Sequence, residues 1–262
     1  MTPRVHVLGG GRIGRAVAAR LSGGVIGVEV SLFEPWQTPA PGADLSVLCL
    51  HDGAQVRRVL AAARHGSCGH EVLDLTTQDL RGVGEAARLA AAIGAGYCAG
   101  GVLGGAAAVR DGQAQVLQGP SPGATALALL GRLGPVRVFE DAAAACAAKL
   151  LHNLALILNN HAIALCLRLA PAAGIADIET VLDAGTAGRA PGRSSVARDF
   201  RAGGPSSYTS ALVAKDLLAI LDSFPALPPA DAATLRRLQA WHAAGGDAPY
   251  TRAALDLAGG RE

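Results

Sequence analysis

Short apolar runs alternate with helical patterns through the first half of the chain. Six of these runs have the length and composition of β-strands. They lie at residues 5–8, 28–34, 45–50, 72–75, 116–119 and 136–139. Their nearly continuous apolar character is typical of strands that are covered on both faces of a parallel sheet. The helical patterns between them predict an α/β fold, a doubly wound parallel sheet with right-handed crossovers.

Beyond residue 140 the strand-like pattern stops and the chain becomes helical. Asp141 is in position to cap a helix that continues to about residue 170. This is the most apolar stretch, but Lys149, Asn153 and other polar residues interrupt it, which predicts a buried helix rather than a membrane span. Further helices follow, with Gly/Pro-rich breaks at 184–192 and 203–205. We expect a sheet domain over 1–140 and an all-helical second domain over 141–262.

A glycine-rich turn joins the first strand to the first helix. Gly9, Gly11 and Gly14 fill the glycine positions of G-x-G-x-x-G, with Arg12 and Ile13 between them. The first glycine permits a tight turn, the second lets the backbone approach a pyrophosphate, and the third lets helix and strand pack closely. The N-terminus of the helix offers N–H donors to phosphate. The pattern predicts a Rossmann-type, dinucleotide-binding first domain.

Glu34 ends the second predicted strand, 20 residues after Gly14. A carboxylate at that place accepts hydrogen bonds from the adenosine ribose and repels a 2′-phosphate. This favours NAD over NADP as the cofactor. Arg12 and Arg15 stand near enough to serve a phosphate, so NADP remains open.

Charge and cysteine usage exclude several other classes of protein. The 23 basic and 21 acidic residues give a net charge of +2 and are scattered, which argues against a nucleic-acid partner. The five cysteines form no C-x-x-C motif, and no histidine pair has the spacing of metal ligands, so no metal site is predicted. A strand that begins almost at the first residue leaves no room for a signal peptide. We expect a reduced, cytoplasmic protein with a small-molecule substrate and no membrane partner.

Segments in a fixed order carry a resemblance to a known family. They are Gly9–Gly14, Leu48–Asp52, Asp74–Thr77, Ala99–Gly112, Lys149–Asn153 and Lys215–Leu217. In this order the chain resembles the β-hydroxyacid dehydrogenases, which include 3-hydroxyisobutyrate dehydrogenase. The resemblance implies an NAD(P)-dependent oxidoreductase that acts on a β-hydroxy acid or related alcohol. It also implies a homodimer or homotetramer.

The resemblance further implies roles for individual residues. Lys149 corresponds to the general acid/base and Asn153 to a residue that orients substrate. Their spacing of four places both side chains on one face of a helix. Hydride transfer from an alcohol requires a group that takes the hydroxyl proton, and burial would lower the pKa of a lysine from about 10.4 towards a useful range. Cofactor contacts are implied for Leu50, His51, Thr76 and Lys215.

The segment implied to bind substrate consists of Val102, Leu103, Gly104 and Gly105. It keeps the two glycines of the family pattern, but Leu103 stands where the family has serine, which indicates a less polar substrate pocket. Two alternatives remain open. One is an imine reductase-like enzyme, against which Lys149 argues, and the other is a catalytically silent dinucleotide-binding or redox-sensing protein.

Overall fold

The computed structural model describes residues 2–23, 28–34, 37, 42–120, 123–184 and 208–250. The chain divides into two compact units, residues 1–150 and 151–262. The domain boundary predicted at residue 140 is where the long helix α6 (Ala142–Leu169) begins, whereas the division between the units lies within that helix. The predicted Gly/Pro-rich breaks lie outside the described residues, apart from Ala184.

The first unit is built on a seven-stranded sheet with the order β2-β1-β3-β4-β5-β6-β7. The strands are β1 (Arg4–Leu8), β2 (Glu29–Phe33), β3 (Leu45–Leu48), β4 (Glu71–Asp74), β5 (Gly96–Leu103), β6 (Gln115–Gly119) and β7 (Val136–Val138). Neighbouring strands are parallel except for β5 and β6. This confirms the predicted fold class and all six predicted strands.

Two details of the sheet depart from the prediction. The strand β5 was not predicted, because glycines hide its apolar pattern. The pair β5–β6 is antiparallel, and the 11 residues of the connection, 104–114, explain why. A parallel crossover needs a dozen or more residues, so this short connection, with the helix α4 (Gly105–Asp111), returns the chain in the opposite direction.

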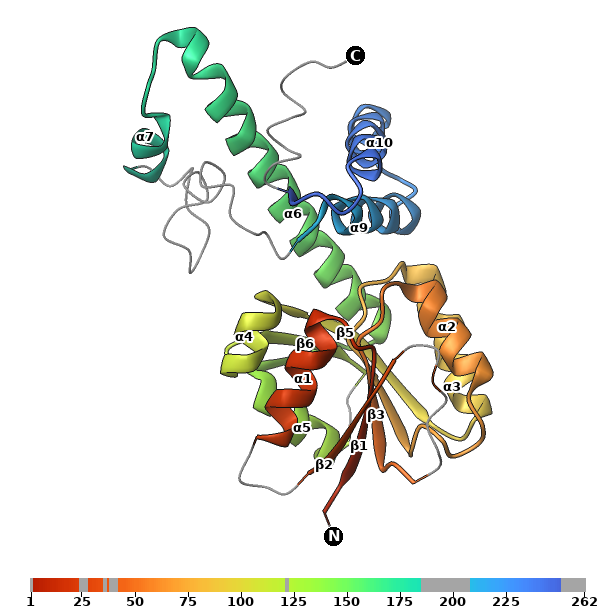
Figure 1. Ribbon diagram of the computed structural model, residues 1–262. Helices are drawn as coiled ribbons and strands as arrows, with labels where there is room; N and C mark the ends of the chain where they lie inside the picture. The colour runs from red at the N-terminus through yellow and green to blue at the C-terminus, as the bar shows by residue number, and fades with distance from the viewer. Residues whose placement is uncertain are drawn as a thin grey trace. The chain divides into compact units, whose positions relative to one another are not determined.

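Helices cover both faces of the sheet (Figure 1). One face carries α1 (Arg12–Ser22), α4 and α5 (Ala124–Leu133), and the other carries α2 (Gly53–Ala62) and α3 (Leu80–Ala92). A separate apolar core forms on each face. The first turns of α6 join the second of these faces, where Cys146 packs with Val83 and Ala99.

The helix α6 begins where the sequence predicts, because Asp141 Oδ1 accepts a hydrogen bond of 2.7 Å from Ala144 N. By length and composition alone α6 could cross a membrane, and 33% of its most apolar window is buried. The expectation that the whole helix is buried is therefore wrong. Four leucines on it are between 39% and 56% exposed, namely Leu151, Leu158, Leu165 and Leu169, which we call the leucine row.

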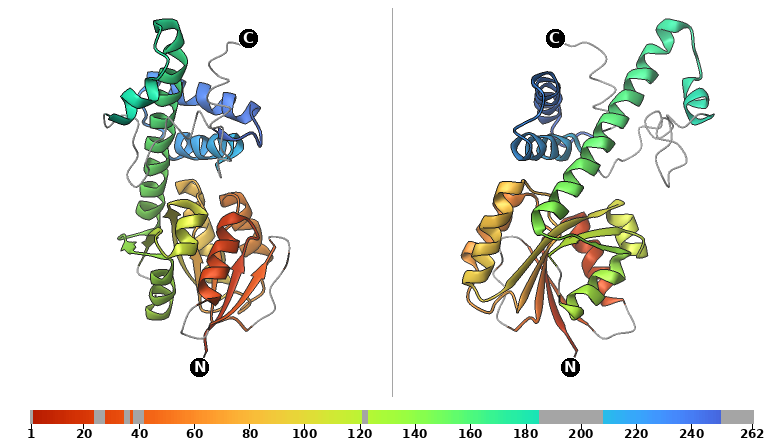
Figure 2. Two further views of the ribbon diagram at one scale, coloured as in Figure 1. Left: turned by 60° about the vertical axis from the view of Figure 1, so that its left-hand side comes forward. Right: turned by 180° about the vertical axis from the view of Figure 1, so that it is seen from behind.

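In the second unit, the remainder of α6 is followed by the short helix η1 (Pro171–Ala173) and by α7 (Ile178–Ala184), and then by α9 (Ser210–Ser223) and α10 (Pro229–Ala244). Figure 2 shows α9 and α10 lying against each other in two views. Ser210 Oγ and His242 Nδ1, 3.1 Å apart, join these two helices. Tyr250 OH donates to Ile157 O at 3.1 Å and so ties the end of the described chain to α6.

Candidate active site

The glycine turn after β1 is packed tightly at two of its glycines and open at the third. Gly9 has a φ of +117°, and a Cβ there would overlap the carbonyl of Cys49. A Cβ on Gly14 would overlap the carbonyl of Gly9, so α1 can lie this close to β1 only with glycine at that position. At Gly11, in contrast, a Cβ would meet no atom within 4 Å. The space beside Gly11 is where a pyrophosphate would approach the backbone.

The first turn of α1 presents backbone donors without a side-chain cap. Gly11 is the N-cap residue and forms no side-chain hydrogen bond to the helix. Arg12 is exposed at the start of the helix, and Ile13 is half-buried against the core. Uncapped N–H groups together with the positive end of the helix dipole suit an anionic phosphate. The residues of the turn therefore fit a dinucleotide cofactor.

Glu34, after the end of β2, lies directly against the glycine turn. Its carboxylate occupies the space that a Cβ on Gly10 would take. Arg15 Nη2 lies 3.3 Å from Glu34 Oε1, and Arg15 also donates through Nε to the carbonyl of Gly10. Both side chains are at least one-third exposed, so this ion pair contributes little stability. The predicted ribose-binding carboxylate is thus next to the predicted phosphate site.

The ends of β3 and β4 are joined through Thr76. Leu50 N donates to Thr76 Oγ1 at 3.0 Å, and Thr76 N donates to Asp74 Oδ1 at 2.8 Å. Thr76 is only 2% exposed, so its hydroxyl holds the two strand ends together. Of the predicted cofactor contacts at this edge, Leu50 is half-buried and His51 is exposed.

Sequence reasoning missed the polar cluster beneath this edge. Asp74 is fully buried, and its Oδ2 accepts from Tyr97 OH at 2.6 Å and from Gln78 Nε2 at 2.8 Å. Burial raises the pKa of Asp74, while the hydrogen bonds from Tyr97 and Thr76 lower it. Burial and the neighbouring Asp74 raise the pKa of Tyr97, which therefore stays protonated as a donor. In the sequence, the only sign of this cluster is the position of Asp74 within an apolar strand.

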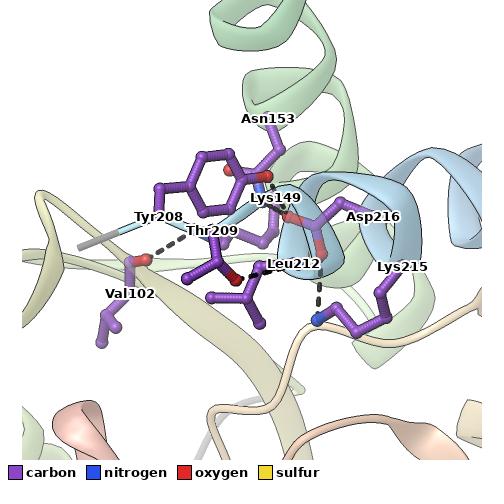
Figure 3. Close-up of polar contacts among 8 residues, drawn as sticks. All are labelled: Val102, Lys149, Asn153, Tyr208, Thr209, Leu212, Lys215 and Asp216. Atoms are coloured by element: carbon purple, nitrogen blue, oxygen red, sulfur yellow. Dashed lines mark hydrogen bonds and ion pairs between the residues drawn. The ribbon is translucent and has the colours of Figure 1, made fainter. Parts of the chain in front are cut away.

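Lys149 is held by the main chain of β5. Its Nζ donates to the carbonyl of Val102 at 2.8 Å (Figure 3). Gly101 makes room for it, since a Cβ there would lie 3.1 Å from Lys149 Cγ. The structure therefore brings Lys149 to the start of the predicted substrate segment. In the rest of that segment, Leu103 and Gly105 are half-buried and Gly104 is exposed.

In the second unit, Asn153 and Lys215 meet at the carboxylate of Asp216, a residue of the segment Lys215–Leu217 to which the sequence assigned no role. Asp216 Oδ2 accepts from Asn153 Nδ2 at 2.8 Å and from Tyr208 OH at 2.5 Å. Lys215 Nζ lies 2.9 Å from Asp216 Oδ1 (Figure 3). Asp216 is 2% exposed, so the carboxylate that these side chains share is buried. Burial and the nearby Asp216 raise the pKa of Tyr208.

Lysine is scarce in this chain, and its positions are informative. Only two of the 23 basic residues are lysines, Lys149 and Lys215, and all others are arginines. Arginine stays protonated in proteins, whereas lysine can exchange a proton when its surroundings lower its pKa. Both lysines lie in the groups of contacts described above.

The fold and the glycine turn define a protein that binds NAD(P), an oxidoreductase. A family model described as the NAD binding domain of 6-phosphogluconate dehydrogenase matches residues 7–146. Because this match covers more than half of the chain, the protein belongs to that family. The match confirms the resemblance to the β-hydroxyacid dehydrogenases. A search among curated proteins gave no match.

Solved structures share this fold over almost the whole chain. 3-Hydroxyisobutyrate dehydrogenase from Mycobacterium tuberculosis, solved with L-serine, is 23% identical with a TM-score of 0.77, covering 98% of this chain and 99% of that one. Psf3, in complex with NADP+ and 2-OPP, is 21% identical with a TM-score of 0.74. The match covers 97% of this chain and 99% of Psf3. A reductive aminase from Aspergillus terreus is 20% identical with a TM-score of 0.54, covering 98% and 99%. At these identities the likenesses show the fold.

An alanine at position 14 is expected to reduce stability, whereas an alanine at position 11 is expected to reduce cofactor affinity. Gly14→Ala should destabilise the fold by about 1–3 kcal/mol, because the new methyl group overlaps a backbone carbonyl. Gly11→Ala should cost less than about 1 kcal/mol of stability. It should nevertheless weaken NAD(P)H binding about tenfold or more, because the methyl group occupies the approach to the pyrophosphate. Urea unfolding and nicotinamide fluorescence measure the two effects.

Gly84→Ala is the matched control, since a Cβ on Gly84 in α3 also meets no atom within 4 Å. It should leave cofactor affinity unchanged and raise stability by about 0.5–1 kcal/mol, because alanine favours the interior of a helix more than glycine does. Unchanged NAD(P)H binding by Gly11→Ala would show that the turn does not hold the cofactor.

Proposed function

We propose that the protein interconverts a small β-hydroxy acid, or a related alcohol, and its carbonyl compound, with Lys149 as the general acid/base. The observation that carries the proposal is the position of Lys149. Its amine is fixed at 2.8 Å from the carbonyl of Val102, in the same compact unit as the glycine turn. The three glycines of that turn and the uncapped start of α1 supply the dinucleotide site.

When bound, the nicotinamide cofactor supplies or accepts the hydride. In the oxidation direction, neutral Lys149 Nζ takes the hydroxyl proton while the C–H bonding pair leaves with the hydride. In the reduction direction, the Lys149 ammonium returns that proton to the carbonyl oxygen. Asn153, one helical turn further along α6, holds the substrate oxygen in place during both steps.

Leu103 narrows the class of substrate. It stands half-buried in the segment 102–105 and brings no hydrogen-bonding group, so a compact substrate with an apolar part suits this position. The Mycobacterium tuberculosis relative was solved with L-serine, itself a β-hydroxy acid, which makes that compound a reasonable first probe beside 3-hydroxyisobutyrate and short alcohols. An imine reductase-like activity is the second candidate, and the fold shared with the Aspergillus terreus reductive aminase supports including imines in the panel.

Replacement of Lys149 tests the proposed mechanism. Lys149→Ala should lower kcat by about 10²–10⁴-fold, because the transferred proton loses its carrier. Lys149→Arg should not rescue turnover, since a guanidinium can bond to Val102 O but does not release its proton. NAD(P)H affinity should stay within about threefold of the wild type in both variants. Steady-state kinetics over the substrate panel and cofactor fluorescence measure these effects.

Arg237→Ala, at an exposed position on α10, is the control and should leave kcat unchanged. Turnover that survives in Lys149→Ala would contradict the acid/base role. Cofactor binding without turnover of any compound would favour the catalytically silent alternative instead.

We further propose that NAD is preferred over NADP. The carboxylate of Glu34 against Gly10 supports this, because it would repel a 2′-phosphate. The NADP+ complex of Psf3 and the exposed Arg15 beside Glu34 are reasons to test it directly.

Glu34→Ser should shift the ratio of kcat/KM for NADP to that for NAD upward by about tenfold, since it removes a like charge and leaves Arg15 for the phosphate. Glu29→Ser, at the exposed opposite end of β2, is the matched control and should not alter the ratio. A wild-type protein that already favours NADP would refute the proposed preference.

We also propose that the protein self-associates through the leucine row. Together with Ala155 and Ala162, the row repeats along α6 at alternating spacings of four and three residues. This is the spacing with which helices form coiled-coil seams, and exposed apolar rows of this kind mark interaction surfaces. A second copy of the chain offers the same row.

Leu158→Glu should therefore reduce the mass in solution towards the 26.3 kDa of one chain, because it places a charge in the middle of the seam. Light scattering after size exclusion measures this mass. Leu127→Glu on α5 is the control, since Leu127 is 39% exposed and Leu158 41%. A monomeric wild type, or an unchanged mass for Leu158→Glu, would rule out this interface.

A further inference from the structure

Asp216 carries a buried carboxylate to which three other side chains bind. Asn153 Nδ2 and Tyr208 OH reach Oδ2 at 2.8 and 2.5 Å, and Lys215 Nζ lies 2.9 Å from Oδ1. Figure 3 shows the carboxylate of Asp216 in the middle of this group. With only 2% of Asp216 exposed, water cannot replace these partners, so loss of any of them leaves a buried charge less well compensated.

This arrangement decides which way the amide of Asn153 faces. A primary amide has a donor end and an acceptor end, and a half-turn about its last side-chain bond exchanges them. An ionised carboxylate only accepts hydrogen bonds, so the nitrogen of Asn153 must face Asp216. The oxygen Oδ1 then faces away from the carboxylate. A residue at 216 that could both donate and accept would allow either orientation.

We propose that Asp216 is a positioning residue that holds the amide of Asn153 in a single orientation for substrate binding. The orientation stands on contacts within the second unit, whereas its use on a substrate rests on the proposed function. Asn153 is four residues after Lys149 on α6, and this spacing puts both on one face of the helix. Lys215 and Tyr208 support Asn153 indirectly, by fixing the carboxylate that orients it.

The small number of asparagines makes the orientation measurable. The chain contains three, Asn153, Asn159 and Asn160, so selective ¹⁵N labelling of asparagine side chains gives three pairs of NH₂ signals. Asn153→Ala assigns the pair of interest. In Asp216→Ser, the Asn153 protons should exchange with water about tenfold faster or more, because their acceptor is gone. The signals of the other two asparagines should not change.

Asp222→Ser is the matched control, because Asp222 is an exposed aspartate on the same helix α9. It should leave all three pairs unchanged. Should Asp216→Ser fail to fold, the isosteric Asp216→Asn replaces it. Its amide can donate as well as accept, so Asn153 is no longer held in one orientation and its protons should again exchange faster. The added amide appears as a fourth pair. The proposal would be overturned if the side-chain NH₂ protons of Asn153 exchanged with water at the same rate with and without the Asp216 carboxylate.

Kinetics separate positioning from a purely structural role. Asp216→Asn should lower kcat by about 10–100-fold through misplacement of Asn153, with NAD(P)H affinity within about threefold of the wild type. In an Asn153→Ala background the same substitution should cause no further loss, since Asp216 acts through Asn153. Independent, multiplicative losses would contradict the proposal. The exchange experiment needs no substrate, so it decides the orientation even if Lys149→Ala disproves the proposed function.

Discussion

The unbroken backbone of α6 sets the distance between the two residues on which the proposed chemistry depends. Residues four apart on an α-helix lie about 6 Å apart along its axis and on the same face. Each side chain is then fixed by its own contact, Lys149 by Val102 O and Asn153 by Asp216.

The parts of the fold that depend on local sequence were predictable. The glycine turn, the capping of α6 by Asp141 and the six apolar strands each have a short, contiguous signal. The direction of β6 was not predictable from the strand itself, because it depends on the length of the connection that precedes the strand. The exposure of the leucines on α6 was also mispredicted. An apolar helix has the same kind of sequence whether one of its faces or all of them are buried.

The candidate site shows the same division between local and distant information. Gly9, Gly11, Gly14 and Lys149 belong to recognisable motifs, so the sequence alone was enough to single them out. Asp74 and Asp216 also lie in family-like segments, but their hydrogen bonds could not be predicted, because their partners come from distant parts of the chain. Tyr97 lies 23 residues from Asp74, and Asn153 lies 63 residues from Asp216. Buried carboxylates of this kind become visible only when the tertiary structure shows what donates to them.

The acceptor that holds Lys149 is a peptide carbonyl, and this has an evolutionary consequence. Every amino acid at position 102 would present the same oxygen, so no point mutation there deletes the acceptor. The side chain at 102 is constrained by something else, since Val102 is buried in the apolar core of the first unit. Gly101 is constrained by Lys149 itself, because the lysine stem fills the space above it. Selection therefore acts on these adjacent positions of β5 through different neighbours, the core at 102 and the lysine at 101.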